Sequence, residues 1–106
     1  MMRTLKHLKP MPLASLEADD SHVEAFGSLA HLSRLRLFFF LVRAGREVPA
    51  GEIQEALEIP APTLSHHLDI LRRAGLIQSR REARYVYYSV DRKAVGELVR
   101  LLTACC

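Results

Sequence analysis

The stretch PTLSHHLDILRRAGLIQSRREARYVYYSV, residues Pro62–Val90, decides the fold because its periodicity changes halfway along. Leu64, Leu68 and Leu71 recur at spacings of four and three residues, which is typical of the buried face of a helix. Gly75 is well suited to end that helix, because glycine readily adopts the left-handed conformation that follows many helices. The first half of the stretch therefore predicts an amphipathic helix.

The second half of the stretch predicts a two-stranded β-hairpin. Its β-branched and aromatic residues favour strands at Leu76–Ser79 and Arg84–Val90, which flank a charged tip at Arg80–Ala83. Tyr85 and Tyr87 share one face of the second strand. We expect these tyrosines to pack within the hairpin and not to serve as platforms for base stacking.

Two helices are expected near the start of the chain. The first is expected to begin at Asp19–Ser21, whose side chains can cap a helix N-terminus. The second is expected to be capped by Ser33 and to end at Gly45, and it is apolar nearly all round, which favours a central position. Its core-facing stripe is predicted to comprise Leu35, Phe38, Phe39 and Val42, widened by Leu37, Phe40 and Leu41.

A third helix is expected to begin with Pro49 inside its first turn and to bury Ile53, Ala56 and Leu57. The prolines of Glu58–Pro62 then favour a tight turn, and Pro62 suits the first turn of the next helix. Two helices joined by so short a turn are typical of a helix-turn-helix.

The chain is expected to finish with a helix capped by Asp91. Four helices, a hairpin and one helix predict a mainly α protein with a β-hairpin wing, an α+β winged helix-turn-helix. We expect residues 1–20 to form an N-terminal arm and residues 21–106 to form the domain. The apolar stripe of the last helix is predicted to comprise Ala94, Val95, Leu98, Val99, Leu101 and Leu102.

The composition is that of one small globular domain. Of the 106 residues, 49% are hydrophobic and 25% are charged, and no apolar run is long enough to span a bilayer. The N-terminal residues lack the continuous apolar region of a secretory signal. We therefore expect a cytoplasmic protein without a membrane partner, whose thiols stay reduced.

Positive charge is concentrated near the hairpin. The net charge is +3, yet five arginines between positions 72 and 84 face a single acid, Glu82. A local cationic patch suits a phosphate backbone, although a solvated charged face gives the same pattern. The hairpin arginines of this patch, which could clamp phosphates or enter a minor groove, are Arg80, Arg81 and Arg84.

The helix of Pro62–Gly75 carries the predicted DNA-reading surface. Its residues pointing away from the leucine stripe combine small hydroxyls, an imidazole and charged groups, a surface that a major groove can accept. His67 lies on the inward side and is expected to be a hydrogen-bonded structural histidine and not a metal ligand. The outward residues are Thr63, Ser65, His66, Asp69 and Arg73.

These motifs resemble those of the arsenic-responsive repressor (ArsR) family of dimeric winged-helix transcription factors. The resemblance covers residues Val23–Cys106. It is most specific over Pro62–Tyr88, where the motifs PT-x-S-x-HL and L-x-x-AGL are followed by a charged tip and two tyrosines. It implies a homodimer formed through the first and last helices. It also implies that Thr63, Ser65 and His66 read an inverted-repeat operator in double-stranded DNA, so that the chain is not an enzyme.

Several family subtypes do not match. The founding subtype has cysteines near the start of the third helix, where this chain has Pro49 and Gly51. The zinc- and nickel-sensing subtypes need an aspartate and several histidines or glutamates along the last helix. Asp91 and Glu97 are present, but no histidine follows His67, so such a site cannot be assembled. At the hairpin tip, Ala83 replaces the commoner glycine.

One subtype does match, and it carries an adjacent cysteine pair just after the last helix. This chain has such a pair in Cys105 and Cys106, which are its only cysteines. The implied inducer is trivalent arsenic or antimony, a soft centre that takes three thiolates, with no permanent cofactor. The third sulfur would come from a small thiol, from the other subunit or from a lost residue.

Other readings of the cysteine pair remain open at this point. The same fold could sense oxidants, reactive sulfur or another soft metal through Cys105 and Cys106, or it could bind DNA without any effector. A thiol enzyme or metallochaperone is a further reading, but no histidine base or orienting acid lies beside the pair in the sequence.

Overall fold

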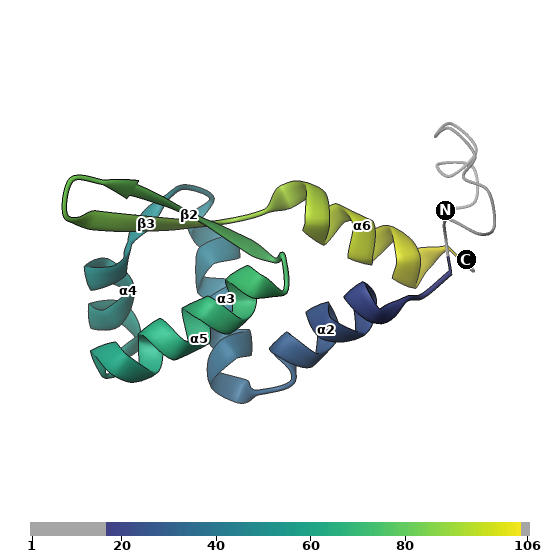
Figure 1. The fold of residues 1–106 in the computed structure, drawn as a ribbon, viewed down its shortest axis with the longest axis horizontal. Coiled ribbons are helices and arrows are strands. Elements are labelled where there is room, and N and C mark those ends of the chain that lie inside the picture. The colour runs from purple at the N-terminus through teal and green to yellow at the C-terminus, as the bar shows by residue number, and fades with distance from the viewer. Residues whose placement is uncertain (1–16, 105–106) are drawn as a thin grey trace.

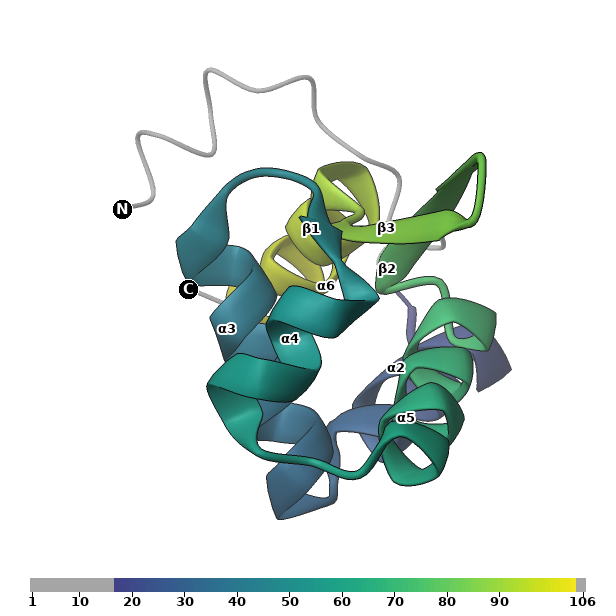
Figure 2. The same ribbon diagram turned by 90° about the vertical axis from the view of Figure 1, so that its left-hand side faces the viewer.

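The computed structural model describes residues 17–104, and within that range it confirms a winged helix-turn-helix (Figure 1). Helices α3, α4 and α5 form a compact body, with the β2–β3 hairpin against it as the wing (Figure 2). The elements run in the order α2 (Asp20–Leu29), α3 (Leu32–Ala44), β1 (Val48–Pro49), α4 (Ala50–Leu57), α5 (Ala61–Arg73), β2 (Ile77–Glu82), β3 (Tyr85–Val90) and α6 (Arg92–Thr103).

The wing belongs to a three-stranded antiparallel sheet in the order β1-β3-β2. The short strand β1 pairs Val48 with Tyr88 of β3, and the sequence pattern did not predict it. Arg80 and Arg81 lie within β2 and not at the tip, which corrects the predicted hairpin. Strand β2 extends further than predicted because Glu82 still pairs with Tyr85, whereas β3 begins one residue later than predicted, which leaves a two-residue turn.

The helix ends follow local backbone chemistry. Asp19 caps α2 by accepting hydrogen bonds from backbone N–H groups of Ser21 and His22, as the sequence predicted. The cap of α3 is His31 and not Ser33, because the His31 imidazole accepts the hydrogen bond from the Ser33 N–H. Gly45 ends α3 at a φ of 61°, a conformation that favours glycine.

The hydrophobic core lies between α3, α5 and the sheet. It confirms the predicted leucines of α5 but corrects the stripe of α3, whose buried residues are Leu37, Phe38 and Leu41. Phe39 is 52% exposed, and Val42 is also exposed, so residues 17–104 leave the second apolar face of α3 largely uncovered. Ala56 is exposed, and the core side of α4 is provided by Ile53. Pro49 is the N-cap of α4 and does not lie inside its first turn.

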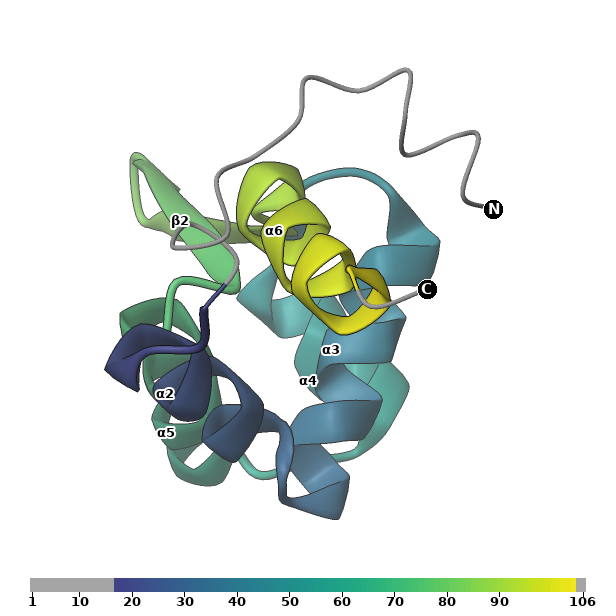
Figure 3. The same cartoon turned by 90° about the vertical axis from the view of Figure 1, so that its right-hand side faces the viewer.

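Helices α2 and α6 project together from one end of the body (Figure 3). Asp91 caps α6 as predicted, and Leu98 is the buried residue of that helix. The rest of the predicted stripe of α6 is only partly covered. Large apolar side chains exposed on α2, α3 and α6, or at the corner between α2 and α3, are Val23, Phe26, Leu32, Phe39, Val42, Val99 and Leu102.

The boundary between the predicted arm and the domain lies close to the first residue that the structure describes. Helix α2 begins at Asp20, while most of the predicted arm of residues 1–20 lies outside the described residues. The division into arm and domain therefore stays a prediction. Across residues 17–104 no single helix is long and apolar enough to cross a membrane, although α2 and α3 meet that test as a pair bent by 96°.

Candidate nucleic-acid interface

Helix α5 is held by one apolar face. Pro62 lies in its first turn, where a missing N–H costs nothing, and Gly75 follows its end with a φ of 84°. Leu64, Leu68 and Leu71 are buried in the core. The packing of these leucines in the core fixes which side of the helix faces outward.

The outward side of α5 carries the residues that the sequence predicted. Thr63, Ser65 and His66 are exposed in the first half of the helix. The two hydroxyls can donate or accept hydrogen bonds, and the imidazole can do either at its two nitrogens. They are therefore free to meet base edges or phosphates.

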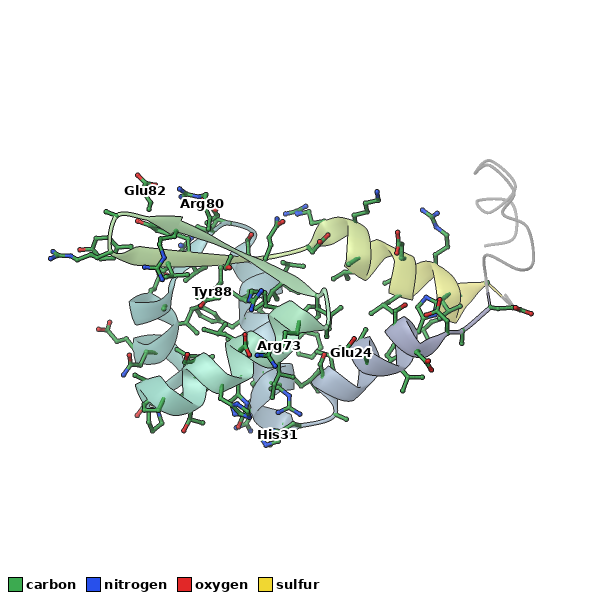
Figure 4. All side chains as sticks on the ribbon, viewed as in Figure 1. Glu24, His31, Arg73, Arg80, Glu82 and Tyr88 are labelled. Carbon is green, nitrogen blue, oxygen red and sulfur yellow. The ribbon has the colours of Figure 1, made fainter. Side chains whose placement is uncertain are left out.

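The second half of α5 carries a small ion-pair network. Asp69 Oδ1 lies 2.8 Å from Arg72 Nη2, and Asp69 Oδ2 lies 2.9 Å from Arg73 Nε. One carboxylate thus holds two arginines. Figure 4 labels one of them, Arg73, on α5. Asp69 and Arg73 were among the predicted site residues, whereas Arg72 was not, although its three-residue spacing from Asp69 is typical of a helical ion pair.

The wing positions Arg80 by three interactions. Its guanidinium lies 2.8 Å from Glu47 Oε2 and 2.7 Å from Glu82 Oε1, and it stacks 4.9 Å from the centroid of the Tyr87 ring. Hydrogen bonds from Arg80 lower the pKa of Glu47, and the two carboxylates raise the pKa of Arg80. Arg80 is therefore an ion-paired strand residue whose exposed guanidinium is already neutralised.

The other two wing arginines are not ion-paired within residues 17–104. Arg81 lies in β2 opposite Val86 and is exposed. Arg84 follows Ala83 in the turn, and its guanidinium lies 5.5 Å from the centroid of the Tyr85 ring. Ala83 has a φ of 55°, which strains a residue with a Cβ. Arg81 and Arg84 are the wing cations available to a phosphate.

His67 is buried as predicted, but the predicted hydrogen bond is wrong for its Nδ1. That atom is buried without a hydrogen-bond partner. The ring lies 5.0 Å from that of His31 and 6.1 Å from that of His66, measured between centroids. Burial lowers the pKa of His67, and the nearby positive charge of His31, Arg34 and His66 lowers it further. His67 is thus a neutral packing residue.

The metal-ligand prediction concerns residues that the structure does not describe. Cys105 and Cys106 lie outside residues 17–104. Inside that range, no group of three or more histidine, cysteine, aspartate or glutamate side chains could hold a metal ion. The Cys105–Cys106 site stays a prediction.

Comparisons with known proteins agree with this geometry. Residues 29–80 match a family model described as a helix-turn-helix domain. The chain is 35% identical to a biofilm growth-associated repressor of Agrobacterium fabrum, over 89% of this chain and 80% of the relative. It is 33% identical to the transcriptional activator HlyU of Vibrio cholerae, over 88% of this chain and 85% of the relative. Both relatives regulate transcription, which confirms the expectation that the chain is not an enzyme.

Solved structures extend the similarity to three dimensions. HlyU from Vibrio cholerae matches with a TM-score of 0.63 at 33% identity, over 79% of this chain and 92% of that chain. A homodimeric winged helix-turn-helix domain of a possible ArsR-family regulator from Mycobacterium bovis matches with a TM-score of 0.67 at 27% identity, over 81% and 78%. The exposed face of α5, the wing beside it and these relatives together show that the chain belongs to the ArsR family of winged helix-turn-helix transcriptional regulators.

Proposed function

We propose that this regulator is a cytoplasmic homodimeric repressor that binds an inverted-repeat operator and releases it when trivalent arsenic or antimony binds Cys105 and Cys106. The observation that supports DNA binding is that α5 is buried on one face and exposed on the other. Its leucines are fixed in the core while Thr63, Ser65 and His66 remain exposed. A helix presented in this way fits a major groove.

The wing supplies contacts beside the groove. Arg81 and Arg84 extend the cationic surface from α5, and they have no carboxylate partner in the described part of the chain. Arg73 and Arg80 are held by acids, so they can reach a phosphate only by exchanging one anionic partner for another. We therefore assign the free phosphate-binding capacity of the wing to Arg81 and Arg84.

The apolar residues on α2 and α6 support a dimer. Val99 is 54% exposed and Leu102 is 61% exposed in the protomer, and Val23 and Phe26 are exposed on α2. Exposed large apolar side chains on two helices at the same end of the protomer favour association with a protein partner. The homodimeric Mycobacterium bovis domain supports a second copy of this chain as that partner.

The inducer follows from chemistry and from the family resemblance. In the sequence, Ala104 alone separates Cys105 and Cys106 from α6, the helix that the proposal places in the dimer interface. Two adjacent thiols can supply two of the three sulfurs that As(III) takes, and a small thiol or the partner subunit would supply the third. Binding there releases DNA if the metalloid prefers the DNA-free arrangement of the dimer.

DNA binding is tested by selecting a duplex from a random library with the full-length protein and measuring its affinity at several salt concentrations. The triple variant Thr63→Ala/Ser65→Ala/His66→Ala should lose sequence preference while keeping salt-dependent binding. Glu97→Ala, an exposed change on α6, serves as the control and should bind like the wild type. If the triple variant selects the same sequence with equal affinity, α5 does not read the operator.

The dimer is tested by analytical ultracentrifugation. Val99→Asp/Leu102→Asp places two charges on the exposed face of α6, so it should yield a monomer that retains its helical circular dichroism. The full-length wild type should sediment as a dimer under the same conditions. A wild-type protein that stays monomeric at all concentrations would contradict the proposal.

Induction is tested by titrating the protein–operator complex with arsenite. Wild type should release DNA, with a coupling of about 5- to 150-fold in affinity. Cys105→Ser/Cys106→Ser should bind DNA normally and ignore arsenite. Equal release from both proteins would exclude the cysteine pair as the sensor.

A second candidate effector is thiol oxidation. A solved structure of reduced HlyU from Vibrio cholerae matches this chain at 34% identity with a TM-score of 0.62, covering 78% of this chain and 88% of that chain. Its reduced state favours testing peroxide and polysulfide in the same release assay. Release by these reagents and not by arsenite would assign the cysteine pair to redox sensing.

A further inference from the structure

A groove of about 770 Å³ is lined by residues of α3, β2, β3 and α6 and of the loop that follows α3. It is bounded by the end of α3, the inner ends of β2 and β3, and the first turns of α6. Its apolar wall includes Leu41, Val42, Val90 and Val95. This volume falls within the range of small-molecule sites, which extends from roughly 300 to 1,000 Å³.

The charges that line the groove are unequally satisfied. Arg46 is paired with Glu52 at 2.6 Å, and Glu47 is paired with Arg80 at 2.8 Å. The Asp91 carboxylate caps α6 by accepting a hydrogen bond from the Ala94 N–H at 3.1 Å. The lining acids are therefore occupied by partners of their own.

Two lining cations have no such partner. Among residues 17–104 the structure places no carboxylate in an ion pair with Arg92 or Lys93. The guanidinium of Arg92 reaches back over the end of α3, where a Cβ added to Gly45 would lie 3.8 Å from its Nη2. The groove thus combines an apolar wall with two unneutralised positive groups.

We infer that this groove binds a small organic acid, with its carboxylate on Arg92 and Lys93 and a short apolar tail against Val42, Val90 and Val95. A carboxylate forms charge-assisted hydrogen bonds with both kinds of donor, and the tail removes apolar wall from water. A neutral molecule of the same shape would leave both cations unpaired. A fully charged polar anion would gain nothing from the wall.

The position of the groove gives such a ligand a route to the DNA. Helix α6 is attached to the body through Val95 and Leu98, and the groove opens beside that attachment. An acid bound there ties the first turn of α6 to α3 and the wing strands. This consequence rests on the proposed function, in which α6 joins two protomers and so sets the spacing of their α5 helices, which must match half-sites about 34 Å apart.

The binding experiment uses octanoate as the probe and the full-length protein without DNA. Isothermal titration below the micelle concentration of octanoate should give saturable binding, and octan-1-ol should bind at least about tenfold more weakly. Arg92→Gln/Lys93→Gln should weaken octanoate binding by a similar factor. Arg36→Gln/Arg43→Gln, which removes two positive charges from α3 outside the groove, is the matched control and should bind like the wild type.

The outcomes separate the groove from the proposed function. Absence of saturable octanoate binding, or equal binding by wild type and Arg92→Gln/Lys93→Gln, overturns the inference whether or not the protein binds DNA. A second measurement adds octanoate to the operator complex, where a change in DNA affinity in the wild type and not in that variant supports the coupling. Octanoate binding with unchanged operator affinity would retain the site and refute its link to α6.

Discussion

Helices α5 and α6 carry nearly the same apolar pattern and have opposite surroundings. In α5, Leu64, Leu68 and Leu71 are all buried within the protomer. In α6, Leu98 is buried but Val99 and Leu102 are more than half exposed. The apolar face of α5, at the end proposed to face DNA, is therefore covered within one protomer. At the end formed by α2 and α6, large apolar side chains remain exposed.

The charges differ between the two ends in the same way. At the DNA-facing end, Asp69, Glu47 and Glu82 pair with arginines that a phosphate backbone would otherwise attract. Beside the first turns of α6, Arg92 and Lys93 have no ion-pair partner among residues 17–104, because the acids that line the same groove, Glu47 and Asp91, are held by Arg80 and by the first turn of α6. Core contacts and ion pairs within the protomer hold α5 and the wing in place. In contrast, α6 has apolar side chains that are exposed and cationic side chains without ion-pair partners among residues 17–104. This difference supports the proposal that regulation acts through α6.

The largest effect is expected from truncating the buried face of α5. Leu71 is 0% exposed, so Leu71→Ala removes buried methyl groups and leaves a cavity, which should lower the free energy of unfolding by about 2–5 kcal/mol. Leu102→Ala makes the same chemical change at a side chain that is 61% exposed. It should leave protomer stability within about 0.5 kcal/mol of wild type. Both variants are measured by urea denaturation in a Val99→Asp background, after ultracentrifugation has established that this background is monomeric, and equal losses would contradict the comparison.

An intermediate effect on stability is expected when the pH is lowered, because the buried imidazole of His67 on α5 has an Nδ1 without a hydrogen-bond partner. The pKa of His67 is lowered in the folded protein by burial first and then by His31, Arg34 and His66. As the pH falls below about 6.5, the unfolded chain binds a proton that the folded chain resists, so stability is present above that pH and is lost below it. The slope for one proton is at most about 1.4 kcal/mol per pH unit.

The measurement compares urea denaturation between about pH 7 and about pH 5 for two variants. His67→Leu should remove part of the acid loss, because its side chain cannot take up a proton. His66→Asn removes only the smallest of the influences that lower the pKa of His67, so it should keep most of the wild-type slope. An unchanged slope in His67→Leu would mean that the buried imidazole does not control the acid sensitivity.

How far the sequence predicts this structure depends on the range of each interaction. Caps and stripes act over a few residues, so Asp19, Asp91 and the leucines of α5 were predicted correctly. The same rules failed for Ser33, because the preceding imidazole of His31 occupies the cap, and for Phe39 on α3, because a helix that is apolar all round has no single buried face. Periodicity identifies an apolar face but does not say whether the same chain covers it.

The candidate site shows the same limit. The exposed positions Thr63 and Ser65 followed from the helical period alone. The pairing of Arg80 with Glu47 joins residues 33 apart, and it depends on the two-residue strand β1, which is too short to leave a period in the sequence. The unsatisfied Nδ1 of His67 likewise depends on how α5 meets the start of α3. Long-range partners of charged and buried polar groups were therefore not predictable.

A smaller effect is expected at the wing tip. Ala83 has a φ of 55°, where a Cβ costs about 1–2 kcal/mol and glycine does not incur this cost. Ala83→Gly should therefore stabilise the protein, by about 1 kcal/mol after allowing for the greater freedom of glycine in the unfolded chain. Thermal unfolding measures the change, with Ala104→Gly, at a position of negative φ, as the control. A lower melting temperature for Ala83→Gly would show that the turn differs from a left-handed conformation.

The smallest effect is expected from removing the carboxylate that holds two arginines at the DNA-facing end. Asp69→Asn frees Arg72 and Arg73 and takes one negative charge off the exposed side of α5. Exposed ion pairs contribute up to about 1 kcal/mol, so affinity for random duplex DNA should rise by no more than about fivefold. Glu97→Gln removes the same charge from α6, and it should leave affinity unchanged at salt concentrations that screen distant charges. Fluorescence anisotropy with a random duplex measures both variants. If the two substitutions raise affinity equally, net charge and not the position of Asp69 limits non-specific binding. If only Asp69→Asn raises affinity, the carboxylate on α5 weakens the binding of this helix to DNA that lacks the operator sequence.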